Sequence, residues 1–176
     1  VGLAAVEIGK ALGARVIAAA GGAAKLALAR ERGADEAIDY RTADLRAAVR
    51  ELTGGKGADV AFDPVGGDAF DACLRALAWE GRLVVVGFAS GRIPAAPANT
   101  LLLRNCSVVG LYWGAYRKRD PAVIESSMAE LFRWHEAGRI RPFVSHRYDL
   151  TEAASALAAL ARRESTGKVV IVTGRS

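Results

Sequence analysis

The stretch Gly81-Arg82-Leu83-Val84-Val85-Val86-Gly87-Phe88 decides the fold of this chain. Its unbroken apolar run contains three valines and lies between two glycines, a pattern that predicts a short strand over residues 82–88. A continuous run of this kind is typical of a strand that is buried on both faces. Because helices cover both faces of such a strand, the stretch predicts the interior of a parallel sheet.

Segments with helical and with strand-like periodicity alternate on both sides of this strand. The expected helices cover residues 3–12, 23–32, 43–52, 68–78, 121–137 and 152–163. The other expected strands cover residues 15–20, 36–39, 58–62, 107–113, 144–148 and 168–173. Parallel strands joined by right-handed helical crossovers form a doubly wound sheet, so the alternation predicts an α/β fold of this class.

The composition excludes several other classes of protein. Hydrophobic residues make up 52% of the 176 residues and charged residues 24%, which is typical of a globular domain and not of a disordered chain. No apolar run reaches the roughly 18–20 residues of a membrane span, so no membrane partner is expected. The net charge is +5, but the basic residues are dispersed along the chain and most have acidic neighbours, as in Arg30-Glu31-Arg32. This pattern argues against a nucleic-acid partner.

A candidate phosphate site follows the expected strand 15–20. Dinucleotide sites that select NAD place an acidic residue there, but this chain has none before Lys25. Gly21 and Gly22 permit close approach, a helix start supplies backbone N–H groups, and Lys25 supplies a cation, so we favour a bound phosphate over an ordinary turn. Tyr40 follows the next strand; stacking on an adenine, a hydrogen bond to the phosphate and simple packing all remain open for it.

A second candidate site follows the strand 82–88. In open α/β sheets ligands bind beyond the carboxyl ends of the strands, where Gly87 permits close approach and Phe88 and Ala89 can cover a cofactor ring.

Gly2 precedes the first helix, as the last glycine of a phosphate-binding turn would. Neither histidine has a partner at metal-ligand spacing, so we expect no metal ligand and assign no catalytic residue.

Six stretches together carry a resemblance to a known family. They are VGLAAV at 1–6, IDYR at 38–41, LTGGKGADV at 52–60, DPVGG at 63–67, GRLVVVGFASG at 81–91 and TGKVVI at 166–171. Together they resemble the cofactor half of a medium-chain dehydrogenase/reductase, and within that superfamily the zinc-independent NADPH:quinone oxidoreductase branch, which includes zeta-crystallin. The resemblance covers nearly the whole chain.

The resemblance implies a Rossmann-like fold and an NADPH-dependent reductase that transfers hydride to quinones or other conjugated carbonyls. It places Lys25, Tyr40 and Arg163 at the 2′-phosphate of the cofactor, and residues 87–89 at its nicotinamide end. It also implies a cytoplasmic homodimer that pairs through the edge strand 107–113. Two alternatives stay open: an enoyl-thioester or acrylate-type reductase, and a non-catalytic NADPH-binding protein with a structural or RNA-associated role.

The chain also departs from the family pattern at its amino end. The family has an amino-terminal GroES-like substrate domain and a first Rossmann strand, neither of which has a counterpart here. We therefore expect residues 1–138 to be an amino-terminally truncated NADP(H)-binding domain and residues 139–176 to be a carboxyl-terminal segment of the substrate domain. The absent strand is central in the doubly wound order, so we expect a gap in the middle of the sheet and low stability of the isolated chain.

Overall fold

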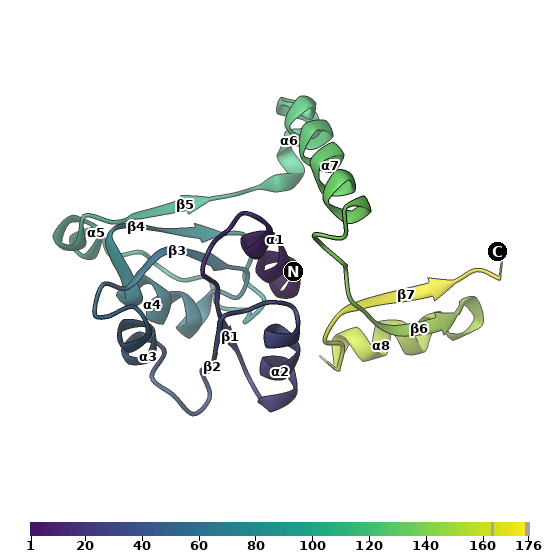
Figure 1. Ribbon diagram of the computed structural model, residues 1–176, viewed down its shortest axis with the longest axis horizontal. Coiled ribbons are helices and arrows are strands. Elements are labelled where there is room, and N and C mark those ends of the chain that lie inside the picture. The colour runs from purple at the N-terminus through teal and green to yellow at the C-terminus, as the bar shows by residue number, and fades with distance from the viewer. Residues whose placement is uncertain (163, 175–176) are drawn as a thin grey trace.

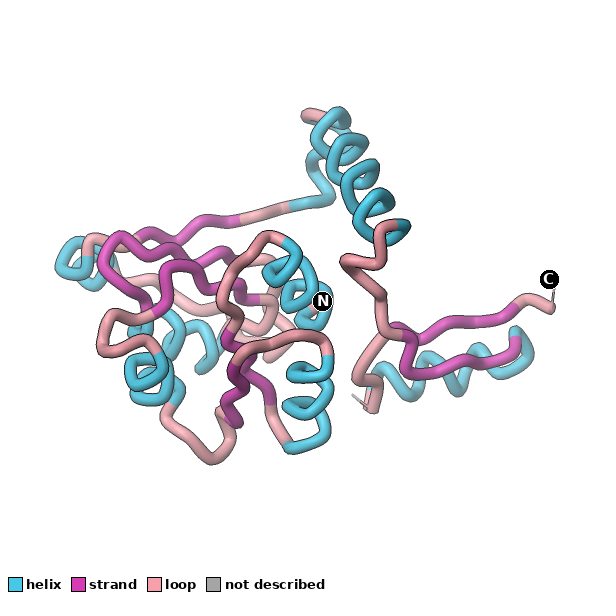
Figure 2. The backbone as a smooth tube through the Cα atoms, viewed as in Figure 1, coloured by secondary structure: helices cyan, strands magenta, loops and turns pink. Residues whose placement is uncertain are grey.

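Helices and parallel strands alternate along the chain in the computed structural model, which describes residues 1–162 and 164–174 (Figures 1 and 2). The α-helices are α1 Gly2–Ala11, α2 Ala23–Glu31, α3 Leu45–Leu52, α4 Gly67–Ala76, α5 Ala98–Arg104, α6 Tyr116–Arg119, α7 Pro121–Glu136 and α8 Ala153–Ala161. The strands are β1 Ile17–Ala20, β2 Glu36–Asp39, β3 Ala58–Asp63, β4 Leu77–Val85, β5 Ser107–Gly110, β6 Val144–Asp149 and β7 Lys168–Val172. Two short 3₁₀ turns, η1 Trp113–Ala115 and η2 Leu150–Glu152, complete the assigned elements.

All the strand pairs are parallel, as the sequence predicts, and β4 lies between β3 and β5. A second sheet contains β1 and β2, and within the described residues no strand pairing joins β1 to β3. One edge of β1 and one edge of β3 are therefore unpaired. The expected gap in the sheet is present at this point of a Rossmann-like fold.

The core lies on the faces of these sheets. Leu83 on β4 is fully buried, and Leu77, Phe70 and Leu74 pack with it to join α4 to the strand. A second cluster joins α3 to β2, and a third joins α1 and α2 through Val6, Ala29 and Ala34. The buried strand that the sequence predicts around Leu83 is thus confirmed.

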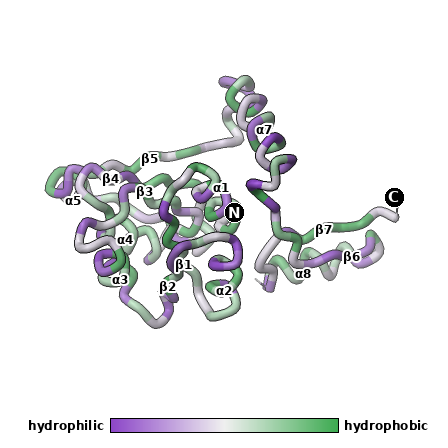
Figure 3. The backbone as a smooth tube through the Cα atoms, viewed as in Figure 1, coloured by the Kyte–Doolittle hydropathy of each residue, from purple (hydrophilic) through white to green (hydrophobic). Residues whose placement is uncertain are grey.

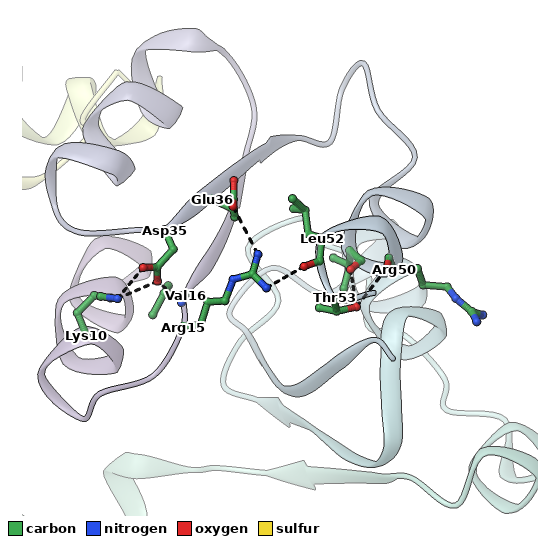
Figure 4. Close-up of polar contacts among 9 residues, drawn as sticks. Lys10, Arg15, Val16, Asp35, Glu36, Arg50, Leu52 and Thr53 are labelled. Atoms are coloured by element: carbon green, nitrogen blue, oxygen red, sulfur yellow. Dashed lines mark hydrogen bonds and ion pairs between the residues drawn. The ribbon is translucent and has the colours of Figure 1, made fainter. Parts of the chain in front are cut away.

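Polar contacts brace the amino-terminal ends of β1 and β2 (Figure 4). Arg15 donates a 2.8 Å hydrogen bond to the carbonyl of Leu52 at the end of α3 and reaches Glu36 of β2 at 3.5 Å. Lys10 of α1 pairs with Asp35 at 2.8 Å. The turns at the opposite, carboxyl ends of the strands carry none of these contacts.

A carboxyl-terminal unit of β6, β7 and α8 follows α7 and lies beside the α1–α2 region (Figure 1). Hydrophobic residues run along α8 and β7 (Figure 3). Arg32, which directly follows α2, donates to the carbonyl of Arg141 at 3.2 Å and lies 4.6 Å from the ring centroid of Phe143. The domain boundary expected between residues 138 and 139 falls in the segment between α7 and β6, and it stays a prediction.

Three segments differ from the sequence expectations. The strand expected over 107–113 ends at Gly110, because the chain turns at Trp113 into η1 and α6. The strand expected from residue 82 begins at Leu77, because this residue pairs with Ala58 of β3 and ends the helix at Ala76. The sequence pattern does not predict helix α5, because the segment before it is rich in proline and alanine. No described helix is long and apolar enough to cross a membrane.

The isolated chain is expected to unfold in a broad transition at low temperature. On β3, Val60 is 56% exposed and Phe62 is 44% exposed, although both belong to a strand inside the predicted sheet. Unpaired edges and exposed apolar side chains favour association with other chains over a cooperative native state. Circular dichroism melting and binding of a hydrophobic dye to residues 1–176 measure this. A sharp transition at high temperature from a monomer would contradict the prediction.

Candidate functional site

The turns that follow β1 and β2 are tied together by one carboxylate. Asp39, the last residue of β2, accepts a 3.0 Å hydrogen bond from the backbone N–H of Gly22, which lies in the turn after β1. The other oxygen of the same carboxylate accepts a 3.0 Å bond from the backbone N–H of Arg41. These bonds and the charge of Arg41 hold the pKa of Asp39 below its usual range, so this side chain is ionised at neutral pH.

A side chain on either glycine of the turn after β1 would meet the side chains that follow β2. A Cβ on Gly21 would lie 3.1 Å from Nε of Arg41 and 3.2 Å from the hydroxyl oxygen of Tyr40. A Cβ on Gly22 would overlap the guanidinium of Arg41, and Gly22 has φ of 97°, which L residues rarely adopt. The structure therefore brings Tyr40 and Arg41 directly over the glycine pair.

Helix α2 begins immediately after this turn. The backbone N–H groups of Ala23 and Ala24 have no hydrogen-bond partner within the described residues, whereas that of Gly22 is already bound to Asp39. Lys25 lies in the first helical turn, is exposed, and has no ion-pair partner in the described part of the chain. Two free N–H groups, the positive end of the helix dipole and a free ammonium group together suit an anion.

The turns that follow β3 and β4 form a second group. Asp63, at the end of β3, is buried and accepts hydrogen bonds of 2.8 Å from the N–H of Val65 and 3.0 Å from the N–H of Gly66. The carbonyl of Pro64 accepts a 3.2 Å bond from Ala89, and that of Val65 a 2.9 Å bond from Ser90. The two turns are thus held against each other by backbone hydrogen bonds.

Glycines permit this close contact. A Cβ on Gly87 would lie 3.3 Å from the carbonyl oxygen of Pro64, and one on Gly66 would lie 3.0 Å from the Phe88 ring. Phe88 remains 42% exposed at the carboxyl end of β4. Gly87, Phe88 and Ala89 therefore share one surface with the turn after β3, and an apolar ring is available on that surface.

Comparison with known proteins identifies the family of this chain. A family model described as zinc-binding dehydrogenase matches residues 1–132. The chain belongs to the zinc-binding dehydrogenase family. Within the described residues, no three His, Cys, Asp or Glu side chains are grouped so that they could hold a metal ion.

Relatives within this family are quinone oxidoreductases and similar proteins. The chain is 44% identical to a quinone oxidoreductase-like protein 2 homolog of Nematostella vectensis, over 98% of this chain and 47% of the relative. It is also 44% identical to quinone oxidoreductase-like protein 2 of Bos taurus, over 97% of this chain and 49% of the relative. The crystal structure of Escherichia coli quinone oxidoreductase complexed with NADPH is similar with a TM-score of 0.87 and 30% identity, over 98% of this chain and 53% of that chain. The chain spans about half the length of these proteins.

The residues predicted from the sequence fall into two groups. Gly21, Gly22 and Tyr40 lie together, and Lys25 lies in the first turn of the adjoining helix. Residues 87–89 form the other group. Gly2 is the first residue of α1, and a Cβ on it would meet nothing within 4 Å. Arg163 lies outside the described residues.

Asp39 and Arg41 are the site residues that sequence reasoning did not assign. Their sequence signal is only their position at the carboxyl end of β2, because the turn that they contact follows β1. Cys73 has the opposite character: burial, and then the charge of Asp63, raise the pKa of its thiol to about 11. This thiol is therefore protonated at neutral pH, as is typical of a buried cysteine that only packs.

Proposed function

We propose that this chain binds NADPH for an oxidoreductase that reduces quinones or other conjugated carbonyls. The observation that carries the proposal is the anion cradle at the start of α2. It combines a glycine turn in which Gly22 has φ of 97°, two N–H groups that are free among the described residues, and Lys25. No acidic residue follows β1 before Lys25. The structural relative that is complexed with NADPH supports the same cofactor.

The residues present suit the two ends of this cofactor. Lys25 and Tyr40 would hold the 2′-phosphate, with the N–H groups of Ala23 and Ala24 pointing out of the helix start. Residues 87–89, together with Gly66, would border the nicotinamide, which supplies the hydride when the cofactor is bound. The apolar ring of Phe88 would exclude water from that end of the site. We assign no proton donor among the described residues.

We also propose that two copies pair through β5. The outer edge of β5 has no strand partner among the described residues, and Val109 on it is 46% exposed. Isologous pairing of two such edges would join two sheets into one and satisfy the free backbone groups. Light scattering on the full-length protein tests this, with a dimer expected. A monomer at micromolar concentration would contradict it.

The proposed activity is tested by cofactor titration and turnover on the full-length protein. Nicotinamide fluorescence should show tighter binding of NADPH than of NADH, and NADPH should be oxidised when 1,4-benzoquinone is added. Oxidation with a crotonyl thioester but not with the quinone would favour the enoyl-thioester alternative. Binding without turnover on either substrate would favour a non-catalytic role, and equal binding of both cofactors would overturn the assignment of NADPH.

A further inference from the structure

The side chain of Arg41 lies where the proposed cofactor phosphate would bind. Its guanidinium occupies the space next to Gly22 that a Cβ would need, and its Cδ and Nε lie 3.1 Å from the corresponding point on Gly21. The side chain is 60% exposed, so neither packing nor burial requires this position. Its ion-pair partner in the described part of the chain is Asp39, 3.6 Å from Nε.

Asp39 determines where Arg41 can reach. One carboxylate accepts the N–H of Gly22 and the N–H of Arg41, so it fixes the backbone of both turns relative to each other. The Arg41 side chain then starts from a held backbone and extends over the turn after β1. Since the carboxylate already has two backbone donors, the guanidinium keeps most of its N–H groups free for an anion.

The charges near the cradle make Arg41 necessary for a dianion. A phosphate monoester carries a charge of about −1.5 to −2 at neutral pH. Lys25 supplies one positive charge, and the ionised Asp39 adds a negative charge close to the same turn. Without Arg41, the described residues of the cradle would supply one cation and one anion, an arrangement that suits a neutral ribose hydroxyl better than a phosphate.

We propose that Arg41 is a specificity-determining residue that selects the 2′-phosphate of NADPH over the 2′-hydroxyl of NADH. This proposal rests on the proposed function and adds to the site of Lys25 a cation from the turn after β2. The planar guanidinium can give two parallel hydrogen bonds to phosphate oxygens, and its charge offsets that of Asp39. Its role is in binding, because it lies at the adenosine end and away from the nicotinamide.

The test compares Arg41→Ala with Arg46→Ala in the full-length protein. Arg46 is an exposed arginine in the first turn of α3 with no ion-pair partner among the described residues, so both variants remove one surface positive charge. Calorimetric titration with adenosine 2′,5′-bisphosphate and with adenosine 5′-monophosphate reports binding without turnover. We expect Arg41→Ala to weaken the bisphosphate by about 10–100-fold and the monophosphate by less than about threefold. Arg46→Ala should change neither by more than about threefold.

Three results would overturn the proposal. Equal weakening of the binding of both nucleotides by Arg41→Ala would show a structural role. Equal effects of the two alanine variants would show a nonspecific effect of the protein's net charge. Unchanged affinities of Arg41→Ala for both nucleotides, with wild-type protein still selecting the bisphosphate, would leave the NADPH assignment standing and exclude Arg41. If wild-type protein has no preference, the proposed function itself fails. Arg41→Lys, which keeps the charge but not the planar fork, should retain an intermediate preference.

Discussion

Replacing Lys25 with glutamate should weaken NADPH binding by about 100-fold or more and leave NADH binding within about threefold of wild type. Lys25 lies in the first turn of α2, next to the glycine turn, and is unpaired within the described residues, so its ammonium group is free for the 2′-phosphate. The variant removes a charge-assisted hydrogen bond and places a carboxylate against a dianion. NADH carries no 2′-phosphate and would not experience this repulsion. Fluorescence titration of both cofactors on the full-length protein measures the effect.

Lys25→Gln separates the two contributions to this effect. It removes the cation without adding an anion, so we expect a loss of about 10-fold for NADPH. Lys56→Glu serves as a matched control, because Lys56 lies in the turn after α3, at the opposite ends of the strands. Equal weakening of NADPH binding and NADH binding in Lys25→Glu would contradict the assignment of this lysine to the phosphate.

Replacing Leu83 with alanine should lower the free energy of unfolding by about 2–5 kcal/mol. Leu83 is fully buried on β4 and packs against Phe70, Leu74 and Leu77, so its removal leaves a cavity between the sheet and α4. The side-chain atoms lose their transfer free energy, and the rigid surroundings do not close the space. Urea unfolding of the full-length protein, followed by far-ultraviolet circular dichroism, measures the change.

Leu102→Ala is the matched control for this substitution. Leu102 on α5 is 80% exposed, so the same chemical change should alter the free energy of unfolding by less than about 0.5 kcal/mol. A loss at Leu83 no larger than that at Leu102 would mean that β4 is not the centre of the core.

The candidate site was partly predictable from the sequence. The glycine pair, Lys25 and the missing acidic residue lie next to one another in the chain, so their chemistry is visible without a fold. For Tyr40 the sequence indicates only an aromatic residue at the end of a strand, and it does not decide the role of this residue. Asp39 and Arg41 could not be assigned, because their function depends on Gly22, which is far from them in sequence and close only through the pairing of β1 with β2.

Local patterns by themselves determined the α/β class, the buried strand around Leu83 and the alternation of elements. Apolar runs and helical spacing reflect which face of each element is buried, so the sequence alone shows them. Only the tertiary structure decided that β4 starts at Leu77, that β5 stops at Gly110, and that a guanidinium from one turn covers the glycines of another. Strand pairing and the approach of two turns depend on contacts between distant residues, and no local periodicity records those contacts.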